Sequence, residues 1–181
     1  MTTNQGAGLA ARLLRVAVSG GLILSTFSFG ADAPSVQMAP RAIAWAEQQS
    51  ARVALSGHAL SPSQVALARR VGVREPERIR ILVVENFPLP QDAEVKAAAM
   101  RIGLDRPSIV GLTLGHSVMV RRGFENDAGL LSHEFRHVWQ YEEQGGIAPF
   151  LARHLQDLAR FGYEDSPFEV DARAHEVHRE L

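Results

Sequence analysis

The hydrophobic pattern after residue 40 predicts two helices followed by a strand. Residues 41–55 have helical composition. Residues 61–73 have Ser61 as a candidate N-cap and Gln64 at the capping-box position, which predicts a second helix. Residues 78–85 (RIRILVVE) alternate apolar and polar positions and are rich in β-branched side chains, so they are typical of a strand.

The middle of the chain combines one helical pattern with a second strand-like region. Residues 92–104 (DAEVKAAAMRIGL) predict a helix that Asp92 can cap. Residues 107–123 (PSIVGLTLGHSVMVRRG) favour two short strands, or one bent strand, around Gly115.

The last third of the chain is helical in pattern. Asp127 can cap a helix that extends to about Glu143, where Gly145 would stop it. Two further helices are predicted over residues 147–162 and 166–181. Helices around a small set of strands predict an α+β fold, mostly helical with a small β-sheet.

The N-terminal segment has the pattern of a targeting sequence. Arg12 and Arg15 precede an uncharged apolar run over residues 16–31, as in a secretory signal peptide. This run is shorter than the roughly 20 residues of a spanning helix. We therefore expect residues 1–33 to be a signal peptide, or an anchor if uncleaved, and residues 34–181 to be one domain. A buried core helix over the apolar run is the alternative.

Composition narrows the classes of partner and of metal site. Hydrophobic residues make up 46% of the 181 residues, which is enough for a packed core. The 19 basic and 20 acidic residues nearly balance, so neither nucleic acid nor an anionic membrane surface is expected as a partner. There is no cysteine, so His, Asp or Glu would have to hold any metal ion.

The stretch LLSHEFRHVWQYEEQGG carries the clearest chemical pattern. His133 and His137 are four positions apart, so on a helix their imidazoles lie on one face and can bind one ion. Glu134 lies beside them and is suited to take a proton from a zinc-bound water, whose pKa the metal lowers towards about 7. The alternative is a core helix whose two histidines are hydrogen-bonded and bind no metal.

Catalytic zinc needs a third protein ligand and one open position. Glu169 is the first candidate, because it lies 32 residues after His137, and an intervening helix can return the chain. Alternatively, Glu169 belongs to a capping box with Ser166. The same predicted helix holds four reserve ligands, of which Asp171 could instead orient a ligand histidine: Asp171, His175, Glu176 and His178.

Three further residues are candidates for outer contacts or for stabilising an oxyanion. Tyr141 is one helical turn beyond His137, and Tyr163 precedes Glu169. Both tyrosines could instead be packing residues. His116 lies at the predicted strand bend and could face the site, or it could be an exposed turn residue. His154 carries no partner pattern.

The motif HEFRH followed by a glutamate on a downstream helix resembles the gluzincin-type zinc metallopeptidases. More closely, the segments LTLGHSVMVRRG, LLSHEFRHVWQYEEQGG and FGYEDSPFEVDARAHE resemble a group of small bacterial metallopeptidase domains. The resemblance covers roughly residues 79–178. It implies a zincin-like fold with His133, His137 and Glu169 as zinc ligands and Glu134 as the catalytic acid and base.

Three functional hypotheses follow from these patterns. The first is an exported zinc-dependent hydrolase, a peptidase acting on a peptide or protein substrate in the periplasm or outside the cell. It would meet the membrane only through an uncleaved N-terminal segment. The second is a non-catalytic, metal-holding module that binds a partner at the cell envelope. The third is a structural α+β domain without a metal.

Overall fold

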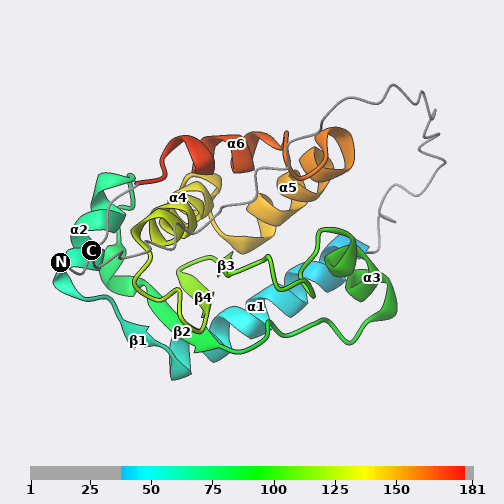
Figure 1. Cartoon of the computed structure of the whole chain (residues 1–181). Coiled ribbons are helices and arrows are strands. Elements are labelled where there is room, and N and C mark those ends of the chain that lie inside the picture. The colour runs from blue at the N-terminus through cyan, green and yellow to red at the C-terminus, as the bar shows by residue number, and fades with distance from the viewer. Residues whose placement is uncertain (1–37, 178–181) are drawn as a thin grey trace, which may run out of the picture. The chain divides into compact units, whose positions relative to one another are not determined.

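A computed structural model describes residues 38–177, which form six α-helices, one short 3₁₀ helix and four strands (Figure 1). The targeting sequence predicted for residues 1–33 and the reserve ligand His178 lie outside the described residues. Among residues 38–177, no helix has the length and apolar character needed to cross a membrane.

The strands form one mixed sheet in the order β1-β2-β4-β3. These strands are β1 (His58–Ala59), β2 (Arg80–Val84), β3 (Gly111–Leu114) and β4 (Ser117–Arg121). β2 and β4 are parallel, whereas β1 pairs with β2 and β3 with β4 in antiparallel fashion. Residues 107–123 therefore contain two strands, and Gly115 has the positive φ of 68° that their tight turn requires. β3 is the outermost strand on one side of the sheet.

The helices of the first half begin where their caps predict. In α2 (Pro62–Arg70), Ser61 forms both halves of the capping box. In α3 (Ala93–Arg101), the Asp92 carboxylate accepts two backbone N–H bonds at the N-terminus. α1 (Met38–Ser56) begins three residues before the predicted start.

The second half contains α4 (Ala128–Gln144), α5 (Ile147–Phe161) and α6 (Pro167–Ala174). Asp127 caps α4, as predicted. The prediction that the last helix continues to residue 181 is wrong over residues 175–177, because α6 ends at Ala174. The chain leaves the helical path there, and the Val177 N–H donates to the hydroxyl of Ser132 on α4 at 2.8 Å.

Helices cover both faces of the sheet. On one face, Ile81, Val118 and Val120 pack against α4, and on the other, Leu114 and Met119 pack against α1. The prediction of an α+β fold with a small sheet is confirmed, whereas the zincin-like arrangement stays a prediction. Neither the two-residue β1 nor the 3₁₀ helix at Pro76–Arg78 was predicted.

Candidate metal centre

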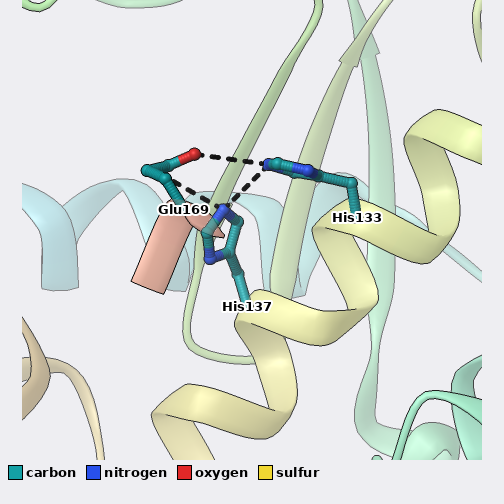
Figure 2. Close-up of side chains that lie close together, drawn as sticks. All are labelled: His133, His137 and Glu169. Atoms are coloured by element: carbon teal, nitrogen blue, oxygen red, sulfur yellow. Dashed lines mark hydrogen bonds and ion pairs between the residues drawn. The ribbon is translucent and has the colours of Figure 1, made fainter. Parts of the chain in front are cut away.

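The HEFRH segment lies in the middle of α4, and its two histidines point toward a glutamate of α6 (Figure 2). The Nε2 atoms of His133 and His137 are 3.1 Å apart. Glu169 Oε2 lies 3.5 Å from His133 Nε2, and Glu169 Oε1 lies 3.5 Å from His137 Nε2. These three residues are called the His–His–Glu group below.

The dimensions of this group fit a metal ion. Bonds of about 2.0–2.2 Å at tetrahedral angles place neighbouring ligand atoms of zinc about 3.3 Å apart. The separations of 3.1, 3.5 and 3.5 Å bracket that value. In addition, Glu169 Oε2 is buried and has no hydrogen-bond partner. A buried acceptor without a partner costs about 1–3 kcal/mol, which a bound cation would offset.

The alternative role of Glu169 in a capping box is not what the structure shows. Ser166 occupies the N-cap of α6, but its side chain makes no capping hydrogen bond. Its hydroxyl instead lies 3.5 Å from His154 Nδ1. Glu169 is therefore directed toward the histidines of α4, and α6 begins without a side-chain cap.

The far nitrogen of each histidine is already held. His133 Nδ1 lies 3.0 Å from Glu176 Oε1, and His137 Nδ1 lies 2.8 Å from Gln140 Oε1. The Gln140 amide nitrogen donates to two acceptors, so its oxygen must be the atom that faces His137. His137 Nδ1 is then the donor, and Nε2 carries the lone pair that a metal ligand requires.

Asp171 acts on the group from a distance rather than as a ligand. Its carboxylate accepts from Arg136 at 2.7 and 3.0 Å and from Gln140 at 2.8 Å. Burial raises the pKa of Asp171, but the bonds from Arg136 and Gln140 outweigh burial and lower it. Gln140 thus connects Asp171 to His137, and the prediction that Asp171 orients a ligand histidine stays a prediction. His175 Nδ1 bonds to the Asp171 backbone oxygen at 2.8 Å and lies outside the group.

Glu134 is buried against β3. Its Oε2 accepts from the Thr113 hydroxyl at 2.6 Å. A Cβ atom built on Gly111 would lie 2.1 Å from Glu134 Oε1, so only glycine leaves room for this carboxylate. Glu134 follows His133 directly in α4, and its charge is among the causes that raise the pKa of the His133 imidazole.

The charges of the His–His–Glu group are strongly coupled. Burial lowers the pKa of His133, but the neighbouring carboxylates of Glu169 and Glu176 outweigh burial and raise it to about 10. Burial raises the pKa of Glu169, but the surrounding imidazoles lower it to about 2. The carboxylates around His133 therefore favour a positive charge in this group. In the metal-free protein, the proton on His133 supplies that charge.

The two tyrosines differ in position. The Tyr141 hydroxyl donates to the Thr113 backbone oxygen at 3.1 Å, so it ties α4 to β3 and is not directed at the His–His–Glu group. Tyr163 faces the group: burial, Glu169 and Glu134 all raise the pKa of its hydroxyl. Tyr163 therefore keeps its proton and remains a hydrogen-bond donor.

His116 belongs to a second cluster, formed with Glu75 and Glu142. Its Nε2 lies 3.0 Å from Glu142 Oε1. Glu142 also accepts the backbone N–H bonds of Arg74 at 2.8 Å and of Glu75 at 3.1 Å. The structure therefore does not bring His116 into the His–His–Glu group. Glu75, His116 and Glu142 are called the Glu142 clamp below.

The sequence pattern did not predict a role for one residue that lies beside the site. His154 Nε2, on α5, lies 3.8 Å from Glu169 Oε1, and burial lowers the pKa of His154 to about 4. Its ring packs beside those of Phe150 and Phe168, with centroids 5.3 and 5.6 Å away. The only sequence signal is its position four residues after Phe150, which puts both on one helix face.

The chain matches no protein-family model, no curated protein and no solved structure. Its class is therefore defined by its own architecture. It is an α+β protein in which two histidines of one helix and a glutamate of another form a group that could hold a metal ion.

Proposed function

We propose that this protein is a zinc-dependent hydrolase that cleaves peptide bonds. The observation that carries the proposal is the convergence of His133, His137 and Glu169, with the buried Glu134 beside them. Catalytic zinc sites have three protein ligands and one open position, whereas structural sites have four. Two imidazoles and one carboxylate are a ligand set of the catalytic kind.

The residues around the group suit hydrolysis. Bound zinc would supply an acidic water and polarise the substrate carbonyl. Glu134, whose carboxylate accepts from the Thr113 hydroxyl, would take a proton from the attacking water and deliver it to the leaving amine. Tyr163, which keeps its proton, is the candidate donor to the carbonyl oxygen.

The position of the sheet favours an extended peptide as substrate. β3 is an edge strand and lies beneath α4, where Thr113 contacts Glu134. Edge strands bind extended peptides through backbone hydrogen bonds. One β3 carbonyl, that of Thr113, is already used by Tyr141. The targeting sequence predicted over residues 1–33 would place this activity in the periplasm or outside the cell.

The test uses the full chain loaded with zinc and a quenched-fluorescent peptide library. Glu134→Gln is expected to lower turnover by about 10²–10⁴-fold, the usual contribution of a general base, and to keep about one zinc per chain. Glu143→Gln is the matched control, because Glu143 lies on the same helix with its side chain 41% exposed. Undiminished turnover in Glu134→Gln would overturn the proposed role of this carboxylate. Zinc binding without any cleavage would favour the metal-holding binding module.

A further inference from the structure

His154 is a buried imidazole that the proposed reaction does not use. We propose that His154 is a positioning residue for Glu169. In this role its Nε2–H holds the carboxylate oxygen Oε1, so that the other oxygen, Oε2, is presented to the metal. The proposal rests on the zinc site of the proposed function, but it does not depend on hydrolysis.

The two oxygens of Glu169 have different surroundings. Oε1 lies 3.5 Å from His137 Nε2 and 3.8 Å from His154 Nε2. Oε2 lies 3.5 Å from His133 Nε2 and is buried without a hydrogen-bond partner. A shift of about 1 Å would bring the His154 contact into the usual hydrogen-bond range of about 2.7–3.2 Å. His154 thus favours binding of the metal through Oε2 alone.

In this proposal Ser166 favours the tautomer of His154 that carries its proton on Nε2. The hydroxyl of Ser166 is fully buried and lies 3.5 Å from His154 Nδ1. An N-cap serine normally accepts a backbone N–H bond at its own helix start, but Ser166 makes no such bond. If this hydroxyl donates to Nδ1, the proton of the neutral ring is on Nε2, which faces Glu169.

Packing fixes the ring in this orientation. Phe150 precedes His154 by one turn of α5, and Phe168 is adjacent to Glu169 in α6. The His154 ring contacts both phenyl rings, which are 3% and 9% exposed. The same contacts therefore hold α5, His154 and the start of α6 together.

The consequence concerns the coordination number of the metal. A carboxylate that binds through both oxygens fills two positions, and one that binds through a single oxygen leaves a position open for water and substrate. His154 is excluded from the set of ligand atoms that lie within 4.8 Å of one another. Its role toward the metal is therefore exerted through Glu169.

The experiment compares His154→Leu with His154→Gln in the full chain, using zinc with a competing chelator and Co²⁺ as a spectroscopic substitute. Loss of an outer contact to a metal ligand typically costs 10–100-fold in metal affinity. His154→Leu is expected to weaken zinc binding by about that factor and to lower the intensity of the Co²⁺ visible bands, as a higher coordination number does. His154→Gln retains a donor and should stay within about threefold of wild type with an unchanged Co²⁺ spectrum.

Ser166→Ala supplies a second, independent test. It is expected to weaken zinc binding by a few-fold in the wild type and to have no further effect in His154→Gln, because glutamine has no tautomer to fix. His58→Leu is the control at an exposed histidine of β1. Circular dichroism checks folding, and if His154→Leu does not fold, His154→Gln and Ser166→Ala still decide the question.

Two results in the His154 variants would overturn the proposal. Wild-type zinc affinity in His154→Leu would show that the imidazole has no influence on the site. Loss of zinc in His154→Gln as complete as in His137→Ala would make His154 a ligand instead. A wild-type protein that binds zinc but cleaves no peptide would remove only the hydrolase proposal, whereas one that binds neither zinc nor Co²⁺ would remove both.

Discussion

Two clusters of histidine and glutamate lie at different points of α4, and they differ in whether their ligand atoms already have hydrogen-bond partners. The His–His–Glu group and the Glu142 clamp each bring three ligand atoms within 4.8 Å. In the first, Glu169 Oε2 is buried without a hydrogen-bond partner. In the second, the Glu142 carboxylate, only 4% exposed, is already bonded by two backbone N–H groups and by His116.

The difference shows that residue types and proximity do not by themselves define a metal site. A ligand atom needs a lone pair that no other group in the protein uses. The outer nitrogens of His133 and His137 are held by Glu176 and Gln140, which directs the inner nitrogens toward Glu169. Glu142 instead fastens residues 74 and 75 to the end of α4, which is a structural role.

The largest expected effect is on zinc affinity, and it comes from disrupting the His–His–Glu group while the Glu142 clamp stays intact. His137→Ala removes one of three ligands and should weaken zinc binding by roughly 10³-fold or more. Glu142→Ala should leave zinc affinity within about threefold of wild type, because the Glu142 carboxylate is already bonded within the protein. Competition with a chelator of known affinity measures both. Equal losses in the two variants would mean that the clamp also takes part in binding.

A smaller effect separates metal binding from chemistry within the His–His–Glu region. Gly111→Ala would place a methyl group 2.1 Å from the present position of Glu134 Oε1, so the carboxylate must move. A displacement of about 1 Å of a catalytic group costs about 10²-fold in rate. Peptide cleavage should fall by about that factor while zinc affinity is retained. Unchanged cleavage would show that Glu134 need not occupy this position.

The Glu142 clamp should instead contribute to the free energy of unfolding. Glu142→Ala removes the acceptor for the backbone N–H groups of Arg74 and Glu75, and two hydrogen bonds of about 0.5–1.5 kcal/mol each amount to about 1–3 kcal/mol. The free energy of unfolding of the zinc-free protein, measured in urea, should fall by about that amount. Glu143→Ala, at a more exposed glutamate next in sequence, is the matched control and should fall by less. An equal fall in both variants would contradict the structural role of the clamp.

The smallest expected effect is the release of a proton when zinc binds. The pKa of His133 is raised to about 10 in the metal-free group, so this imidazole is protonated at neutral pH. Zinc needs the neutral imidazole, and binding at pH 7 should therefore release about one proton from His133. Calorimetry in two buffers of different ionisation enthalpy measures the release. Because the proton belongs to His133, Glu142→Ala should give the same value, and no release in wild type would mean that His133 is neutral before zinc binds.

Local sequence signals predicted most of the fold. The caps Ser61, Asp92 and Asp127 gave the starts of three helices, because a cap and the residues it bonds are within three positions of each other. The end of α6 was not predictable in this way. It depends on a bond between Val177 and Ser132, which are 45 residues apart in sequence.

The residues of the site show the same difference between local signals and contacts that are distant in sequence. His133, Glu134 and His137 follow from helical periodicity alone, and the distance of Glu169 along the chain allows it to return to them. His154 was not predictable from local sequence signals, because its partners Glu169 and Ser166 belong to another helix. Ser166 was expected as a cap, and only the tertiary contact with His154 shows that its hydroxyl is used elsewhere.

The placement of the third ligand on α6 has a mechanical consequence for a chain without cysteine. A metal held by His137 and Glu169 would close a loop of about 32 residues, including all of α5. A disulfide closing a loop of this size restricts the unfolded chain by about 3–4 kcal/mol in the entropy model. The ion would then serve as a removable cross-link between α4 and α6. Chelation would loosen the C-terminal helix, and loss of that helix to a protease would in turn release the metal.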